Sequence, residues 1–344
     1  MRDIQCQEVL NNYGSKTGVI TLSRSSALNA LTFDMLHQLR IHLERWEQDH
    51  AIQGVVIHSD STRAFCTGGD VKALYYDADV LQVVPHPYFE LEYELNRYLF
   101  HYPKPYVALM TGLTMGGGVG ISLHGSHPVV FDSTQLAMPE ARIGFFVDVG
   151  VTYHLSRLSH HLGRWMAVTG LTVDADDCLA LGLSSHKVSM DDYDQLLAEL
   201  TQSHWGGNPY HGVDQVLSRF THSAGKSSLM QQADLIESCF EGNTVEAISS
   251  FIKGSGHAWL ESTQHALSYN APISMQLALL QLERARLSSF DEVIDTDLIL
   301  VQQCLAWQDF KEGVRAALVD RDQQPTWQVD SDEAVAFFSK QGTV

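Results

Sequence analysis

The sequence has few cysteines, no long apolar run and a shortage of positive charge, and each of these absences excludes a class of protein. Its five cysteines are scattered and never occur as C-x-x-C, so neither a disulfide framework nor a zinc knuckle is indicated. No apolar stretch reaches the length of a membrane span, and the N-terminal residues lack the pattern of a signal or transit peptide. We therefore expect a globular, cytoplasmic protein with reduced thiols.

Basic residues are outnumbered by acidic ones. The chain has 22 Lys and Arg against 41 Asp and Glu, a formal net charge of −19. Nucleic acids and anionic membranes require a basic face, so neither is expected as a partner. The chain has 17 histidines, and His160-His161 is the only adjacent pair. Neither a His-x-x-x-His motif nor a carboxylate at a metal-ligand spacing accompanies this pair, so no metal is expected.

The organisation of the chain follows from hydrophobic periodicity. Apolar runs predict strands at 18–22, 54–58, 106–110 and 127–131, and Thr32 is expected to cap a helix with Leu36, Leu39, Leu43 and Trp46 on one face. From about residue 153 the pattern turns mostly helical. No Pro/Gly/Ser-rich linker separates the N-terminal part of the chain from the helical C-terminal part, and residues 203–209 are the best candidate for a boundary between them. We expect a catalytic core at 1–200 and a helical region at 201–344 packing on it.

Two glycine-bearing segments, Ala64 to Asp70 and Met115 to Gly120, each follow a predicted strand. Glycine tolerates positive φ and close approach of a ligand, so each segment can lend one backbone N–H to a single carbonyl oxygen. Two such donors form an oxyanion hole. Glu140, which follows Pro139, can then act as a base or nucleophile on the carbonyl carbon.

The ordered set of motifs resembles the crotonase, or enoyl-CoA hydratase/isomerase, superfamily over nearly the whole chain. The superfamily motifs are at 64–72, 104–108, 114–120 and 138–140. Within it, the motifs at 143–150, 309–316, 320–322 and 325–327 resemble the 3-hydroxyisobutyryl-CoA hydrolase subfamily. The resemblance implies an α/β fold of the crotonase-like (ClpP/crotonase) type, a spiral of repeated ββα units with a helical C-terminal part.

The resemblance also implies the roles of particular residues. The catalytic set would be the backbone N–H groups of Gly69 and Gly117, the carboxylate of Glu140 and its partner Asp148. The groups that bind the substrate would be Gly68, the basic Arg24 and Lys72, and Glu92 on a helix lining the acyl pocket. The partner is an acyl-CoA substrate. CoA is part of that substrate, so no separate cofactor is implied, and a homo-oligomer is possible.

The position occupied by Gly120 favours one reaction over another. Hydratases of the superfamily carry a glutamate there and a second at the Pro-Glu position, whereas this chain keeps only Glu140 and gains Asp148. Thioester hydrolysis needs only an activated nucleophile, a polarised carbonyl and a thiolate leaving group. We therefore expect hydrolysis of 3-hydroxyisobutyryl-CoA or a close β-hydroxyacyl-CoA, as in valine breakdown. The alternatives are a hydratase or isomerase acting through Glu140, and a noncatalytic assembly protein.

Each site residue also has a structural interpretation. Glu140 could be a turn or N-cap carboxylate, Asp148 could cap a helix near 152–162, and Glu92 could be a solvated helix charge. The basic residues could be ordinary surface charges, and Tyr93 belongs to the expected core face of its helix. Val147 and Val151 replace a proline and a glycine common in the family, which bears on the shape of the loop around Asp148.

Overall fold

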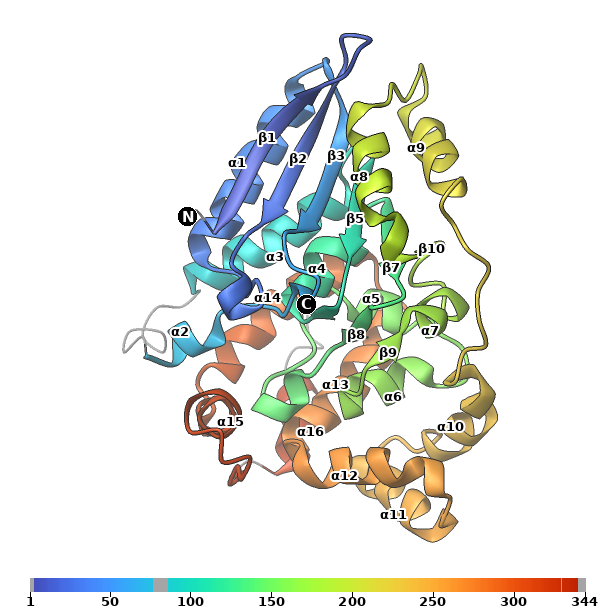
Figure 1. Cartoon of the computed structure of the whole chain (residues 1–344). Helices are drawn as coiled ribbons and strands as arrows, with labels where there is room; N and C mark the ends of the chain where they lie inside the picture. Colours follow the sequence, from blue (N-terminus) through green and yellow to red (C-terminus); the bar gives the residue numbers. More distant parts are fainter. Residues whose placement is uncertain (1–2, 77–85, 329, 340–344) are drawn as a thin grey trace. The chain divides into compact units, whose positions relative to one another are not determined.

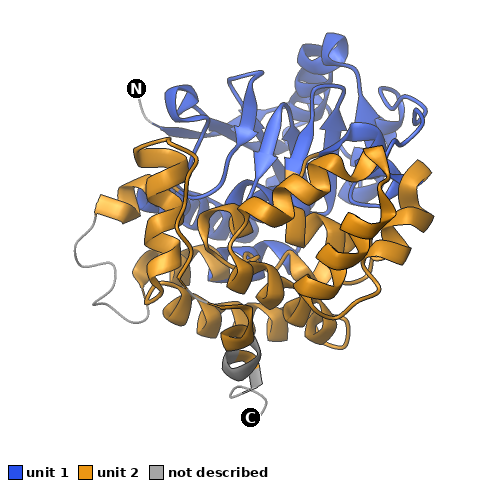
Figure 2. Ribbon diagram, turned by 90° about the horizontal axis from the view of Figure 1, so that it is seen from below, with its two compact units in different colours: residues 1–69, 94–136, 173–230 blue, residues 70–93, 137–172, 231–344 orange. Residues whose placement is uncertain are grey.

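The computed structural model describes residues 3–76, 86–328 and 330–339, and the chain forms two compact units (Figure 2). The first unit spans residues 1–69, 94–136 and 173–230, and the second spans 70–93, 137–172 and 231–344. Each unit is therefore assembled from segments that are remote in sequence. The expected division into 1–200 and 201–344 stays a prediction, because compactness does not show which part folds alone.

The strands form two sheets (Figure 1). The six-stranded sheet has the order β1-β2-β3-β5-β7-β10, in which β1 pairs antiparallel with β2 and the remaining pairs are parallel. Its strands are β1 (Ile4–Leu10), β2 (Lys16–Leu22), β3 (Ile52–Ser59), β5 (Tyr106–Met110), β7 (His127–Phe131) and β10 (His186–Val188). The four-stranded sheet contains β4 (Ala64–Cys66), β6 (Leu113–Met115), β8 (Gln135–Ala137) and β9 (Val173–Asp174).

The described helices are divided between the two units. The first unit contains α1 (Phe33–Gln48), α4 (Gly117–Leu123), α7 (Ala175–Ala180), α8 (Tyr193–Gln202) and α9 (Pro209–Ser218). Residues of α3 (Pro87–Phe100) belong to both units. The second unit contains α2 (Val71–Tyr76), α5 (Thr152–Leu155), α6 (Leu162–Thr169), α10 (Ala233–Cys239), α11 (Val245–Ser255), α12 (Glu261–Tyr269), α13 (Pro272–Ala285), α14 (Phe290–Cys304), α15 (Gln308–Val314) and α16 (Ser331–Ser339).

The connections between the sheets repeat along the chain. Three times in succession one strand enters the six-stranded sheet and the next enters the four-stranded sheet: β3 then β4, β5 then β6, and β7 then β8. Helical segments follow each of these strand pairs. This is the predicted spiral of ββα units, and the described elements after β10 form the predicted helical C-terminal part.

The six-stranded sheet is covered on both faces by helices of its own unit. A Cβ added to Gly18 would lie 2.5 Å from the Trp46 ring of α1, and Gly18 pairs with Val55 in the sheet. One residue earlier, a Cβ on Gly54 would lie 2.5 Å from the ring of Trp205, which packs with α8 and α9. Because successive strand residues point to opposite faces, α1 covers one face and α8 with α9 the other.

The start of α1 and its buried face agree with the sequence pattern. The Thr32 side chain accepts a hydrogen bond of 3.2 Å from the Met35 N–H, which satisfies one of the unpaired donors at the helix start. The four apolar residues expected on one face are buried: Leu36, Leu39, Leu43 and Trp46. The predicted strands are likewise confirmed within β2, β3, β5 and β7.

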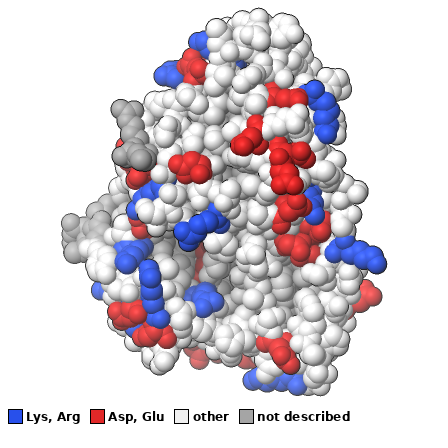
Figure 3. Space-filling model, viewed as in Figure 1, with Lys and Arg blue, Asp and Glu red and all other residues white. Residues whose placement is uncertain are grey.

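The surface is mixed in charge on the face shown in Figure 3, where basic side chains lie singly or in small groups among acidic ones. None of the helices in the described ranges is long and apolar enough to cross a membrane. That the chain binds neither nucleic acid nor membranes stays a prediction from its net charge.

Candidate active site

The two glycine loops meet inside the first unit. They follow β4 and β6, which pair in parallel, so both loops leave the same edge of the four-stranded sheet. Gly68 has a φ of 95°, and a Cβ added to it would lie 3.3 Å from the backbone nitrogen of Gly117. A Cβ on Gly118 would lie 2.2 Å from the Cys66 carbonyl oxygen. The close approach of the loops therefore requires residues without side chains.

The backbone N–H groups predicted as oxyanion donors belong to Gly69 and Gly117. Gly117 is the first residue of α4, where an N–H has no acceptor within the helix. Among the backbone hydrogen bonds outside regular elements in the described ranges, none uses the N–H of Gly69 or Gly117 as donor. The Leu31 N–H instead donates to the Gly68 carbonyl at 2.8 Å and fixes the first loop. The geometry of the first unit is thus compatible with two oxyanion donors.

The segment beside the first loop is held by a buried asparagine. The Asn29 Nδ2 donates to the Ser59 hydroxyl at 2.7 Å and to the Phe65 carbonyl at 2.9 Å. In the same segment Arg24 donates to the Ala30 carbonyl at 2.9 Å. Arg24 therefore lies near the loop, with part of its guanidinium bonded within the unit, and its contact with CoA stays a prediction. Lys72, the other predicted basic contact, is exposed on α2.

The second unit brings together the three carboxyl groups singled out in the sequence. Glu140 is the first residue of the 3₁₀ turn η2 (Glu140–Ile143), Asp148 lies in the loop after it, and Glu92 lies on α3. They are 6%, 5% and 2% exposed, respectively. Burial is the first cause of a raised pKa in all three. The charge of Asp148 then raises the pKa values of Glu92 and Glu140 further, so the groups lie within electrostatic reach.

This grouping determines how the carboxyls ionise. The pKa of Asp148 is raised to about 7, and a hydrogen bond from Tyr93 lowers it in part. The pKa of Glu140 is raised well above its usual range, and its Oε2 has no hydrogen-bond partner among the described residues. Like charges this close cannot all ionise together. The cluster therefore retains protons near neutral pH, and an ionised Glu140 is a stronger base than a solvated carboxylate.

The structural interpretations of two of these residues are wrong. Asp148 does not cap the following helix, because α5 begins at Thr152 with Val151 at its N-cap. Asp148 Oδ2 instead accepts a hydrogen bond of 2.8 Å from the Tyr93 hydroxyl. Glu92 is not a solvated charge, since it is 2% exposed.

The loop that carries Asp148 adopts a strained backbone conformation. Val149 has a φ of 54°, although β-branched residues rarely enter the left-handed region. Such a conformation costs on the order of 1–3 kcal/mol and persists only where surrounding contacts fix it. One of those contacts is made by Gln281 of α13, whose Nε2 donates to the Val147 carbonyl at 2.9 Å. The carbonyl of Val147 is thus bonded to α13, a bond that a proline at this position could also accept.

The turn that carries Glu140 is supported from behind by α15. A Cβ on Gly144, at φ 69°, would lie 2.3 Å from the Asp309 carbonyl oxygen. A Cβ on Gly313 would lie 2.3 Å from the Ile143 carbonyl carbon. The motif at 309–316 therefore packs with its backbone directly against the backbone of the turn that carries Glu140.

Sequence reasoning missed three residues around Asp148. Tyr93 was assigned to the helix core, yet its hydroxyl bonds the candidate catalytic carboxylate. Gln281 and Asp297 come from α13 and α14, and both bond the backbone of the Asp148 loop. The adjacency of Tyr93 to Glu92 was a usable signal. The other two residues had none, because their partners lie more than a hundred residues away in sequence.

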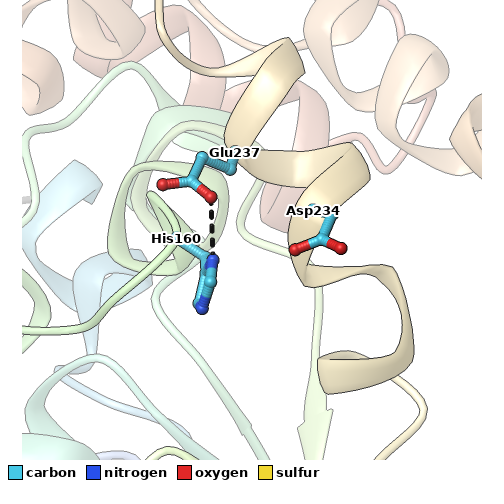
Figure 4. Close-up of side chains that lie close together, drawn as sticks. All are labelled: His160, Asp234 and Glu237. Carbon is cyan, nitrogen blue, oxygen red and sulfur yellow. Dashed lines mark hydrogen bonds and ion pairs between the residues drawn. The ribbon is translucent and has the colours of Figure 1, made fainter.

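A second polar cluster in the second unit involves His160. Its Nδ1 lies 2.9 Å from Oε2 of Glu237, and Asp234 lies beside them on α10 (Figure 4). One ligand atom from each residue lies within 4.8 Å of the others, a spacing that can hold a metal ion. The sequence spacing around His160 did not indicate these carboxylates, because α10 supplies them from more than seventy residues away.

The surroundings of this cluster are unfavourable for a cation. Asp234 and Glu237 are exposed, and exposed acidic groups commonly lie close together without an ion. The surface hollow beside His160 is also lined by Arg157, Arg164 and Arg286. Their positive charges oppose a bound cation.

Comparison with known proteins gives concordant results. The family model described as Enoyl-CoA hydratase/isomerase matches residues 17–337. The mitochondrial 3-hydroxyisobutyryl-CoA hydrolase of Danio rerio is 36% identical over 325 residues, covering 93% of this chain and 85% of the relative. The protein of the same name from Homo sapiens is 36% identical over 327 residues, covering 93% and 84%.

Solved structures agree on the fold and carry other names. A carnitinyl-CoA dehydratase from Mycobacterium thermoresistibile superposes with a TM-score of 0.89 and 31% identity, covering 98% of this chain and 96% of the other. An enoyl-CoA hydratase from Rhodobacter sphaeroides 2.4.1 gives a TM-score of 0.86 and 31% identity, covering 98% and 97%. The predicted resemblance and fold class are confirmed.

Proposed function

This chain belongs to the enoyl-CoA hydratase/isomerase family, and we propose that it hydrolyses the thioester of a β-hydroxyacyl-CoA, with 3-hydroxyisobutyryl-CoA as the preferred substrate. The observation that carries the proposal is the buried grouping of Glu140 with Asp148 on a chain that has Gly120 in place of a second glutamate. The name shared by the curated relatives supports the same substrate and a role in valine breakdown.

The reaction follows from the chemistry of these groups. The thioester carbonyl oxygen would accept hydrogen bonds from the N–H groups of Gly69 and Gly117, which makes the carbonyl carbon electrophilic. The ionised Glu140 carboxylate attacks that carbon, the C–S bond breaks, and CoA leaves as a thiolate that takes up a proton. Water then cleaves the mixed anhydride, which releases the hydroxy acid and regenerates the carboxylate.

A direct attack by water is the alternative route. Glu140 would then remove a proton from a water molecule, and that water would attack the carbonyl carbon without a covalent intermediate. Both routes need the same ionised Glu140. They differ in the fate of a solvent oxygen, because only the anhydride route, with water attacking the Glu140 carbonyl carbon of the anhydride, leaves labelled oxygen in that side chain after a single turnover in labelled water.

Asp148 supplies the proposed preference for β-hydroxy substrates. Its carboxylate would accept a hydrogen bond from the 3-hydroxyl of the acyl group, beside the bond that it already accepts from Tyr93. A substrate without that hydroxyl leaves a buried acceptor unpaired, which costs on the order of 1–3 kcal/mol. Glu92, Gly68, Arg24 and Lys72 are proposed to contact the acyl-CoA.

Hydration of an enoyl-CoA is the second candidate function. The names of two solved structures with 31% identity, a dehydratase and a hydratase, favour it. Addition of water to a double bond needs an acid and a base together, and Gly120 carries no ionisable group to supply the second. Hydrolysis is therefore the better supported reaction.

Three further expectations accompany the proposal. The reaction needs no separate cofactor, since a thiolate is a good leaving group and the oxyanion donors come from the backbone. A homo-oligomer stays a prediction. Cytoplasmic location also stays a prediction, and the curated relatives are named as mitochondrial.

The experiment that tests the proposal compares three thioesters with the wild-type protein. Release of free thiol is measured from (S)-3-hydroxyisobutyryl-CoA and from isobutyryl-CoA, and loss of the conjugated enoyl absorbance is measured with crotonyl-CoA. The proposal expects rapid thiol release from the first, slower release from the second and no change in the third. Consumption of crotonyl-CoA without thiol release would replace hydrolysis by hydration.

A further inference from the structure

Asp297 is a buried carboxyl group that the proposed reaction does not use. It lies on α14 with 0% of its surface exposed, and its Oδ2 accepts a hydrogen bond of 2.8 Å from the Gly150 N–H. Its other oxygen, Oδ1, has no hydrogen-bond partner among the described residues. Burying a carboxyl group with so few partners costs free energy, so we look for the role of Asp297 in the one bond that it accepts, from the Gly150 N–H.

The face of α14 that carries Asp297 lies directly against Gly150. A Cβ added to Gly150 would lie 2.8 Å from the ring of Phe290 and 2.9 Å from Ile294. Residues 290, 294 and 297 share one helix face because their spacing follows the helical repeat. The missing side chain at Gly150 thus allows the helix to approach and brings the carboxyl of Asp297 to the backbone N–H.

The bond is made at the end of the turn that carries Asp148. Val149 and Gly150 have φ values of 54° and 73°, two consecutive left-handed residues immediately after Asp148. A valine in this region returns to its ordinary conformation unless the surrounding structure prevents it. The Gly150 N–H is fixed by Asp297, and the Asp148 carboxylate is fixed by Tyr93, so the turn is held at both ends.

The charges of the cluster are compatible with this arrangement. Burial raises the pKa of Asp297 well above its usual range, the hydrogen bond from the Gly150 N–H lowers it in part, and the charge of Asp148 raises it again. Burial and the charge of Asp148 therefore both favour the neutral form of Asp297.

We propose that Asp297 is a positioning residue, which holds the Gly150 N–H and so fixes the left-handed turn that orients the carboxyl group of Asp148. The inference rests on the proposed function for its consequence in catalysis. Asp297 contacts no reacting atom and acts only through the turn. Because Asp148 recognises the substrate hydroxyl, loss of its orientation reduces selectivity for β-hydroxy thioesters more than it reduces hydrolysis in general.

Three variants of the full chain test the inference. Asp297→Ala removes the acceptor, whereas Asp297→Asn keeps a neutral side chain with an oxygen that can accept from Gly150. The control is Thr296→Val, because Thr296 is the neighbouring residue on α14 and, among the described residues, its hydroxyl donates only to the Glu292 carbonyl of the same helix, at 2.8 Å. Amide hydrogen exchange is followed in a peptide covering residues 148–152, and thiol release is measured from 3-hydroxyisobutyryl-CoA and isobutyryl-CoA.

The expected result has two parts. In Asp297→Ala, exchange in the 148–152 peptide accelerates, and the ratio of kcat/KM between the hydroxylated and plain thioesters falls by about fivefold or more. Asp297→Asn restores both, and Thr296→Val changes neither. A general loss of structure would lower the two kcat/KM values equally and would appear in the melting temperature.

Two outcomes would overturn the inference: unchanged exchange in Asp297→Ala, or an Asp297→Asn variant as impaired as Asp297→Ala. If the wild-type protein released no thiol from either substrate, the proposed function would be wrong, but the positioning role of Asp297 would still be open to test. Hydrogen exchange would still decide whether Asp297 holds the turn.

Discussion

The hydroxyl of Tyr93 donates a hydrogen bond of 2.8 Å to Oδ2 of Asp148, and both residues are buried. This bond stabilises the ionised form of Asp148, because a donor beside a carboxylate lowers its pKa. It thereby opposes burial, which is the main reason that the Asp148 pKa is raised to about 7. Tyr93 thus helps to decide whether Asp148 is an acceptor for the substrate hydroxyl at neutral pH.

Replacing Tyr93 by phenylalanine is expected to slow thiol release. Loss of one partner from a buried carboxylate costs on the order of 1–3 kcal/mol, which corresponds to a decrease of roughly 5- to 150-fold in kcat/KM. The check is a double-mutant cycle with Asp148→Ala. Tyr93→Phe should have little further effect once Asp148 is removed, and fully additive losses would contradict a role through that carboxylate.

Removing the charge of Asp148 is expected to shift the pH dependence of the reaction. The charge of Asp148 raises the pKa of Glu140, so Asp148→Asn lowers that pKa. Activity requires ionised Glu140, and the rising limb of the profile of kcat/KM against pH therefore moves to lower pH in the variant. A low residual activity is sufficient for this measurement, because the pH at which kcat/KM rises does not depend on the maximum value of kcat/KM. A limb that stays in place would show that another group controls the rise.

The buried Glu92 is expected to make stability depend on pH. Its pKa is raised in the folded protein by burial and then by the charge of Asp148. The folded state therefore binds more protons than the unfolded state above the ordinary glutamate pKa of about 4.3, and the free energy of unfolding falls as pH rises from there through the folded pKa.

Glu92→Gln removes this penalty. Its melting temperature should exceed that of the wild type by an amount that grows between pH 5 and pH 8. Glu90→Gln is the matched control, since Glu90 lies on the same helix and is exposed. An equal gain at both pH values, or the same gain in the control, would argue against a buried group that resists ionisation.

Removal of metal ions is expected to leave the reaction unchanged. The proposed chemistry polarises the carbonyl with backbone N–H groups and needs no Lewis acid. Dialysis against EDTA should therefore leave kcat within experimental error, and a melting curve recorded with added zinc tests the separate His160 cluster. A loss of activity that zinc restores, and that His160→Ala abolishes, would assign a function to that cluster.

The extent to which the fold was predictable depends on the range of the interactions. Strand β5 is apolar over its whole length, β3 has an apolar run at 54–57, and α1 shows both a cap and an apolar face, so local patterns sufficed. By contrast, the mostly helical pattern predicted after about residue 153 does not show that α15 ends at Val314 and is followed by a π-helical segment at Arg315–Val319. The close packing of Gly313 on the turn of Glu140 accompanies this change of helix type, and no local pattern reports it.

The residues of the candidate site that lie in short sequence motifs could be predicted. Glu140 and Asp148 stand in ordered motifs of the family, and the glycines of both loops are needed for close approach. The supporting residues could not be predicted in the same way. Tyr93 lies 55 residues from Asp148, and Asp297 lies 147 residues from Gly150, so only the folded chain reveals those contacts.

The most direct test of the central claim is the rate of thiol release from (S)-3-hydroxyisobutyryl-CoA by the wild-type protein and by Glu140→Gln. The account predicts a measurable rate in the wild type and a loss of at least about 10³-fold in a variant with the same circular dichroism and melting behaviour. Thiol release by Glu140→Gln at the wild-type rate would contradict the account, because Glu140 could then be neither the nucleophile nor the base.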